Sequence, residues 1–290
     1  MATLYLISTP IGNLDDLTIR ASATLHSVSH VLAEDTRRTR ILLDHIGARP
    51  PLTSLHAHNE AQRTPLVLSW MAAGEDVALV SDAGTPLVSD PGARLVAAVL
   101  AAGHDVTPVP GPSAVLAALV ASGLPGQRFT FFGFLPRRGG ERRALLERIA
   151  VTPERVVLYE SPERLVRLLN ELTDVCGPER HTAVARELTK VHEEFFRGTL
   201  ADAADYYRER RPRGEVTVVV APAELSTEGE AVVEAEARAL ARRLRAEGMA
   251  PSRAARALAE RLALSRNRAY RIVHEVECDE GDGSASTPEG

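Results

Sequence analysis

Short apolar runs alternate with segments of helical hydrophobic period along the chain as far as residue 122. The runs are typical of buried strands, and the longer segments are typical of amphipathic helices. We expect strands at residues 4–7, 28–33, 52–55, 77–80 and 106–109, and helices at 19–25, 36–46, 62–73, 94–102 and 115–121. Because strands and helices alternate, residues 1–122 are predicted to form an α/β domain with a parallel sheet and right-handed crossovers.

Gly and Pro residues punctuate residues 124–140, and the pattern changes there. Apolar runs then follow one another with fewer helical segments between them. We expect strands at residues 129–134, 156–159, 182–186, 193–199 and 216–221, and helices at 141–149 and 163–172. This mixture predicts a second domain at residues 123–225, with an α+β organisation or a mixed sheet.

The chain has helical period and many Arg and Ala residues from position 230 to 276. Residues 251–262 and 266–276 are separated by a short turn, which is the organisation of a helix-turn-helix. We therefore expect a helical module at residues 230–277. Residues 279–290 are acidic and rich in Gly and Ser, and we expect them to be a disordered tail.

Composition limits the class of protein. The 290 residues include 44% hydrophobic residues, and no apolar run is long enough for a membrane span. The first residues enter a strand and lack a basic segment, so we expect a cytoplasmic protein without a signal peptide. Two distant cysteines exclude a thiolate metal cage and suit a reducing compartment. The net charge of −5 argues against coating of nucleic acid, although one basic face would suffice for a specific RNA enzyme.

The candidate ligand site lies where two parallel strands of the first domain end, because ligands bind at the carboxyl ends of strands in open α/β sheets. An acidic side chain can accept hydrogen bonds from a ligand, and glycine lets the backbone approach it closely. The alternatives are a plain loop at the first strand and a helix N-cap by Ser113 at the second. The residues concerned are Asp82, Gly84 and Thr85 after one strand and Gly111, Ser113 and Ala114 after the other.

Other polar positions allow two interpretations each. The arginines Arg37, Arg38 and Arg40 either bind phosphate or form a solvated helix face, and the cluster of Arg137, Arg138, Arg142 and Arg143 is equally ambiguous. His56 and His58 with Asn59 suit RNA contact or support of a site better than a zinc site, because a third, distant ligand is lacking. We expect no metal.

Several motifs occur in a characteristic order: TPIGNL (9–14), AEDTR (33–37), HAHNE (56–60), ALVSDAGTP (78–86), PGP (110–112), GFLP (133–136), YES (159–161) and ARELTK (185–190). Through them the chain resembles the tetrapyrrole methylase superfamily, most closely the branch that methylates RNA of the small ribosomal subunit. The resemblance implies the two-domain class III methyltransferase fold, with S-adenosylmethionine (SAM) between the domains and the helical module after them. It also implies methylation of a cytidine ribose 2′-hydroxyl in the decoding region of 16S rRNA by a homodimer.

The resemblance supports cofactor contacts at Asp82, Thr85, Ser113 and Ala114 and extends them to Pro10, Ile11, Gly12, Ser161 and Leu188. Methyl transfer to a weakly acidic hydroxyl requires alignment and help with the proton. Lys190, the only lysine, and Glu187 are candidates for this role, as is Glu160; the alternative is a surface ion pair.

Two other functions stay open. One is methylation of a corrin or porphyrin on the same fold, although the loop at residues 9–13 has one glycine where such enzymes have several. The other is a non-enzymatic RNA-binding assembly protein, which would bind RNA through the C-terminal helices and have no affinity for SAM.

Overall fold

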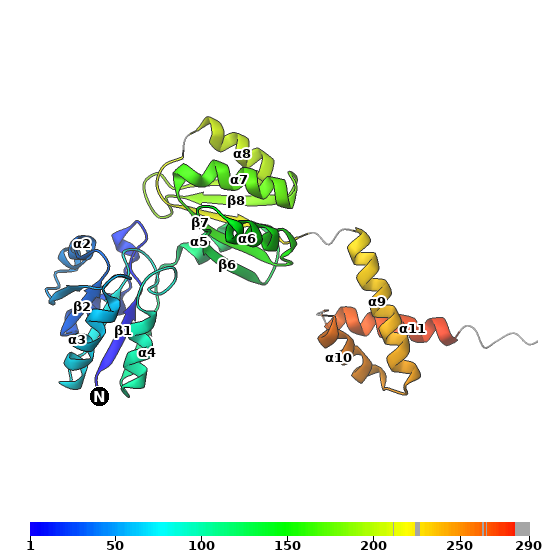
Figure 1. Cartoon of the computed structure of the whole chain (residues 1–290), viewed down its shortest axis with the longest axis horizontal. Coiled ribbons are helices and arrows are strands. Elements are labelled where there is room, and N and C mark those ends of the chain that lie inside the picture. Colours follow the sequence, from blue (N-terminus) through cyan, green and yellow to red (C-terminus); the bar gives the residue numbers. More distant parts are fainter. Residues whose placement is uncertain (211, 224–226, 263, 265, 282–290) are drawn as a thin grey trace, which may run out of the picture. The chain divides into compact units, whose positions relative to one another are not determined.

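The computed structural model describes residues 1–210, 212–223, 227–262, 264 and 266–281 (Figure 1). The chain divides into two compact units, Met1–Ala223 and Glu224–Gly290. The first unit contains two β-sheets with their helices. The second consists of helices.

The first sheet is parallel throughout and has the strand order β3-β2-β4-β1-β5. Its strands are β1 (Thr3–Ile7), β2 (His30–Ala33), β3 (Leu52–Ser54), β4 (Val77–Val80) and β5 (Asp105–Val109). The helices between them are α1 (Ile19–Ser27), α2 (Thr36–Ile46), α3 (Glu60–Ala72) and α4 (Ala93–Ala101), with a short 3-10 helix, η1 (Leu14–Asp16), before α1. The predicted parallel sheet is confirmed, and the predicted ends of its elements differ from the observed ends by at most two residues.

Strand β4 explains why helices cover both faces of this sheet. Its side chains are all apolar, and successive side chains of a strand point to opposite faces. Val77 and Leu79 pack in one cluster with residues of α3 and α4. Ala78 and Val80 pack in another with residues of α1 and α2. A wholly apolar central strand therefore requires a layer of helices on each side.

The second sheet is mixed, as the sequence predicted, with the order β6-β7-β10-β8-β9 and only the β6–β7 pair parallel. Its strands are β6 (Phe129–Phe134), β7 (Arg155–Glu160), β8 (His181–Arg186), β9 (Glu194–Thr199) and β10 (Val216–Val220), and its helices are α6 (Gly140–Val151), α7 (Pro162–Cys176) and α8 (Leu200–Glu209). Helix α8 was not predicted, although Thr199 and Asp202 form a capping box at its start.

Helix α5 (Ala114–Ala121) joins the two sheets into one unit. It follows the last strand of the first sheet, but Val115, Ala118 and Leu119 pack against Val157 and Val219 of the second sheet. The opposite face of the second sheet is covered by α6, α7 and α8. Helix α5 thus continues the first sheet in sequence and belongs to the second sheet by its packing.

The helical unit contains α9 (Thr227–Ala246), α10 (Pro251–Arg261) and α11 (Arg266–Gly281) around an apolar core that includes Leu244, Leu258 and Ile272. Helices α10 and α11 lie where the helix-turn-helix was predicted. Helix α11 includes the first three positions of the predicted acidic tail, 279–281, and the remaining positions, 282–290, lie outside the described residues. Within the described ranges, no helix is both long enough and apolar enough to cross a bilayer.

Arg142 shows that not every basic residue near the start of α6 is available to a ligand. Its side chain is buried, donates to Glu171 Oε2 from Nε (2.9 Å) and Nη2 (2.5 Å), and donates to the Pro136 carbonyl from Nη1 (2.8 Å). Burial acts to raise the pKa of Glu171, but the hydrogen bonds from Arg142 and Arg167 outweigh it and lower the pKa. The interpretation of Arg142 as part of a basic surface is therefore wrong.

We expect Arg142→Ala to lower the free energy of unfolding by about 3 kcal/mol, because it leaves buried polar groups without a partner. Arg143→Ala removes only an exposed ion pair with Glu147 and should cost less than about 1 kcal/mol. Urea denaturation of both variants measures the difference. Equal losses would contradict a structural role specific to Arg142.

Candidate functional site

Two loops at the carboxyl ends of β1 and β4 are held together by backbone hydrogen bonds. The Thr9 N–H donates to the Gly84 carbonyl at 2.9 Å, and the Gly84 N–H donates to the Thr9 carbonyl at 3.0 Å. Thr9 Oγ1 also donates to the Ser81 carbonyl at 3.0 Å. Gly84 has φ +82°, a backbone conformation that residues with a Cβ rarely adopt, so glycine suits this position.

Thr85 connects this pair of loops to the loop after β5. Ser8 Oγ donates to Thr85 Oγ1 at 3.1 Å, and Thr85 Oγ1 donates to the Pro112 carbonyl at 3.2 Å. Three strand ends that lie far apart in sequence are therefore fixed at one edge of the sheet. Ser113, in the third loop, caps α5 by accepting a hydrogen bond from the Leu116 N–H at 3.5 Å.

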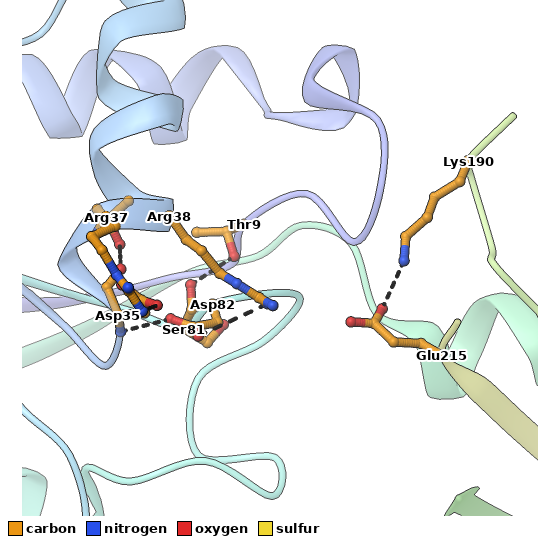
Figure 2. A network of polar contacts seen from close by, with 9 residues as sticks. Thr9, Asp35, Arg37, Arg38, Ser81, Asp82, Lys190 and Glu215 are labelled. Atoms are coloured by element: carbon orange, nitrogen blue, oxygen red, sulfur yellow. Dashed lines mark hydrogen bonds and ion pairs between the residues drawn. The ribbon is translucent and has the colours of Figure 1, made fainter. Parts of the chain in front are cut away.

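Asp82 ties a fourth strand end, that of β2, to the same edge (Figure 2). Its Oδ1 accepts a hydrogen bond from the Asp35 N–H at 2.9 Å, and its Oδ2 lies 4.0 Å from Arg38 Nη1. Asp35 caps α2 and accepts hydrogen bonds from the side chain and backbone of Arg37, which lower its pKa to about 2. The AEDTR segment is thereby held beside the loop that carries Asp82.

A cavity of about 420 Å³ opens at this edge and extends to the strand ends of the second sheet. Seven of the predicted cofactor residues line it, and its other lining residues include Glu34, Arg38, Val88, Asp90, Phe134, Tyr159 and Glu160. The seven are Ile11, Asp82, Gly84, Thr85, Ser113, Ala114 and Ser161. A cavity of about 470 Å³ in the helical unit contains none of the predicted cofactor residues, so we place the candidate site in the first unit.

The four other predicted cofactor residues do not line the cavity. Pro10 and Gly12 flank Ile11, which lines the cavity. Gly111 lies two residues before Ser113, which also lines it. A Cβ at Gly111 would lie 3.0 Å from Ser8 Cβ, so a small residue lets these two loops approach. Leu188 is buried in the apolar cluster that contains Ile11.

The cavity carries an excess of negative charge. The carboxylates of Glu34, Asp82, Asp90, Glu160 and Glu215 line it, and Arg38 is the cation among its described lining residues. Burial, followed by the charges of Glu34 and Asp82, raises the pKa of Asp90 to about 6. Burial, followed by the charge of Asp90, raises the pKa of Tyr159 to about 12. Our sequence analysis missed Asp90, although the segment Ser-Asp-Pro-Gly at residues 89–92 follows the predicted cofactor loop closely.

Glu160 is a buried carboxylate with one free oxygen. Its Oε1 accepts a hydrogen bond from the Ser161 N–H at 2.8 Å and pairs with Arg164 Nη2 at 2.5 Å. Its Oε2 is buried and has no hydrogen-bond partner among the described residues. A buried acceptor without a partner is costly, so this oxygen suits a ligand that can donate a hydrogen bond.

Lys190 and Glu187 form a compact ionic cluster with Glu215 beside the cavity. Lys190 Nζ lies 2.8 Å from Glu187 Oε1 and 3.3 Å from Glu215 Oε2, and Figure 2 shows the Lys190–Glu215 pair. Partial burial acts to lower the pKa of Lys190, but the hydrogen bond to Glu187 and the charge of Glu215 outweigh it and raise the pKa. The hydrogen bond from the Lys190 side chain, together with the one from the Glu215 N–H, lowers the pKa of Glu187 against its partial burial. Both groups therefore stay charged at neutral pH.

The predicted RNA-binding residues are mostly exposed. The side chains of Arg37 and Arg38 are 89% and 60% exposed, and Arg40, Arg137 and Arg138 are also exposed. His58 is exposed and His56 is half-buried, with their rings 6.0 Å apart, and Asn59 Oδ1 accepts a hydrogen bond from the His56 N–H. Among the described residues, no group of three His, Cys, Asp or Glu side chains could hold a metal ion.

The family model "Tetrapyrrole (Corrin/Porphyrin) Methylases" matches residues 3–204. A protein of Synechocystis sp. named "Ribosomal RNA small subunit methyltransferase I" is 46% identical over 96% of this chain and all of that protein. A protein of the same name from Mesorhizobium japonicum is 43% identical over 97% of this chain and 94% of that protein.

The fold is also similar to that of solved structures. The uroporphyrin-III C-methyltransferase of Thermus thermophilus in complex with S-adenosylhomocysteine has a TM-score of 0.54 and 23% sequence identity. The match covers 75% of this chain and 97% of that one.

Gly12 provides a test of the contact between the first loop and the Lys190 cluster. A Cβ at Gly12 would lie 2.4 Å from Lys190 Cγ and 2.8 Å from the Leu188 carbonyl oxygen. We expect Gly12→Ala to lower the free energy of unfolding by about 1–3 kcal/mol, because the loops must move apart. A Cβ at Gly140 would meet nothing within 4 Å, so Gly140→Ala, the matched control, should cause no loss. Urea denaturation that finds no difference between the variants would contradict the close contact.

Proposed function

Because this chain belongs to the tetrapyrrole methylase family, and within it to the ribosomal RNA small subunit methyltransferase I proteins, we propose that it methylates the 2′-hydroxyl of a cytidine ribose in the decoding region of 16S rRNA. The enzyme is a methyltransferase that uses SAM. The observation that carries the proposal is the negatively charged cavity at the strand ends, which coincides with seven residues proposed for cofactor binding from sequence.

The residues around the cavity fit SAM. Ile11, Val88 and Ala114 offer apolar surface for the adenine ring, and Glu160 Oε2 offers a free acceptor for an amino or hydroxyl group. Asp82 and its neighbouring carboxylates favour a ligand that carries positive charge. Pro10, Gly12, Gly111 and Leu188 would act on the cofactor by shaping the loops rather than by lining the cavity. When bound, the cofactor supplies a methyl group activated by its sulfonium charge.

We propose that the RNA backbone lies along the exposed basic residues of the first unit. Arg37, Arg38 and Arg40 lie in the first part of α2, and Arg38 also lines the cavity. Arg137 and Arg138 precede α6. Guanidinium groups suit phosphate oxygens, and a local basic surface is compatible with a net charge of −5. His56, His58 and Asn59 would contact RNA or support the AEDTR segment.

The helical unit and the quaternary structure complete the proposal. Helices α10 and α11 of the helical unit have the organisation of a helix-turn-helix, which supports a second contact with rRNA. We further propose that the enzyme is a homodimer, as its resemblance to the family implies. We also propose that the enzyme acts in the cytoplasm, because its proposed substrate is rRNA.

The proposed reaction is tested with small ribosomal subunits that lack the modification and with SAM labelled on its methyl group. We expect label on the 2′-oxygen of one cytidine of 16S rRNA, located by mapping of ribose methylation. Label on a base atom would contradict ribose methylation. Label on a corrin or porphyrin, with none on rRNA, would favour the alternative enzyme.

Asp82→Ala should weaken SAM binding by about 1–3 kcal/mol in calorimetry, because a hydrogen-bond acceptor is lost from the site.

The cluster of Lys190 and Glu187 supports an electrostatic role in the chemical step. A lysine that keeps its proton can stabilise negative charge that develops on the attacking oxygen. We expect Lys190→Ala to lower turnover about 10- to 100-fold and Lys190→Arg to restore most of it, with SAM affinity unchanged in calorimetry. If the Arg variant is as inactive as the Ala variant, Lys190 acts as a base instead. Full activity of both would make it an ion-pair residue.

A further inference from the structure

Backbone strain is concentrated in two loops beside the cavity. Four non-glycine residues of the described chain have positive φ, namely Leu87 (69°), Ser89 (72°), Glu187 (51°) and Thr189 (65°). Leu87 and Ser89 lie three residues and one residue before Asp90, and Glu187 and Thr189 lie in the loop of Lys190. Such conformations persist where the surrounding structure enforces them, and they gather at functional sites. These conformations indicate that the two loops hold Asp90 and Lys190 in fixed positions.

Asp90 lies in the first of these loops, and its side chain is at the cavity. It is half-buried, lines the cavity and has no hydrogen-bond or ion-pair partner among the described residues. The charged and titratable groups that line the same cavity are Glu34 after β2, Arg38 of α2, Asp82 after β4, Tyr159 and Glu160 of β7, and Glu215 before β10. Burial, followed by the negative charges of Glu34 and Asp82, makes Asp90 a better proton acceptor than an ordinary carboxylate.

The other candidate groups are less suited to accept a proton. Lys190 keeps its proton because Glu187 and Glu215 stabilise the ammonium. Glu187 is stabilised as a carboxylate by Lys190 and by the Glu215 N–H. Glu160 pairs with Arg164, and its free Oε2 is a buried acceptor that suits a hydrogen-bond donor of a ligand. Asp90 is the carboxylate of this set that lacks a cationic partner among the described residues and has a raised pKa, to about 6.

We propose that Asp90 is the catalytic residue that accepts the proton of the attacking hydroxyl, an inference that rests on the function proposed above. The hydroxyl O–H bond breaks and its proton moves to a carboxylate oxygen of Asp90. The oxygen uses an electron pair to bond the methyl carbon, while the bond between this carbon and sulfur breaks and leaves its electron pair on sulfur. One positive and one negative charge disappear together, which a half-buried site favours because charged groups are less well solvated there than in water.

The test compares Asp90→Asn with Asp105→Asn, a matched change at an exposed position at the start of β5. The measurements are the single-turnover rate with labelled SAM and unmodified small subunits, and the Kd of SAM by calorimetry. We expect Asp90→Asn to lower the rate by about 10²–10⁴-fold, which is the range of general base catalysis, and to leave the Kd within a few-fold. Asp105→Asn should leave both unchanged.

The pH profile distinguishes a base from a group that merely shapes the site. The wild-type rate should fall below pH of about 6, where Asp90 becomes protonated, and Asn at position 90 should abolish this limb. Glu34→Gln removes a neighbouring negative charge, so it should lower the pKa of Asp90 and move the limb to lower pH. In the protein without substrate, the carboxyl carbon signal of Asp90 in NMR should show the same shift.

Three results would overturn the inference. These are an Asp90→Asn rate within a few-fold of wild type, a loss of rate matched by an equal loss of SAM affinity, and an acid limb that survives in Asp90→Asn. Each leaves the proposed function intact, provided that the wild-type enzyme labels rRNA. A wild-type enzyme that labels no rRNA would instead refute the proposed function, and the role of Asp90 with it.

Discussion

The pair of backbone hydrogen bonds between Thr9 and Gly84 is the constraint on which the site depends. It joins the ends of β1 and β4, and Thr85 extends the connection to the loop after β5. The strands of a parallel sheet end at one edge, but their loops diverge unless they bond to each other. These contacts pair backbone groups of Thr9, Gly84 and Pro112 within the protein and hold the loops at one edge of the sheet. The cavity is the space that remains between loops fixed in this way.

A second consequence is electrostatic. The loops bring together carboxylates from strands that are distant in sequence, and Arg38 balances only part of their charge. Asp82 is stabilised by the Asp35 N–H, whereas Asp90 has no such partner among the described residues, and this difference separates their roles. The Asp82 carboxylate holds a loop, whereas burial and neighbouring charges raise the pKa of Asp90 to about 6. Two acids eight residues apart in one loop can thus have different chemistry.

Much of the fold could be predicted from the sequence, because a wholly apolar strand such as β4 and the loop with Gly and Pro after it can be recognised from a few consecutive residues. The cofactor loop at Asp82 was predicted for the same reason. Three features depend on tertiary contacts and could not be predicted. Helix α5 packs on the second sheet rather than the first, Arg142 is buried against Glu171, and the pKa of Asp90 reflects its burial and the charge of Glu34, which follows another strand. Local pattern carries no information about which distant side chains meet.

The Lys190 cluster illustrates how composition and structure combine. A single lysine in an arginine-rich chain is weak evidence for a special role when taken alone. In the structure its stem lies against Gly12 of the first loop, and its ammonium lies between Glu187 and Glu215. The contact with Gly12 is at Cγ, an atom that lysine and arginine share. The close approach of the two loops therefore explains the glycine at position 12, and the carboxylates of Glu187 and Glu215 explain a cation at position 190.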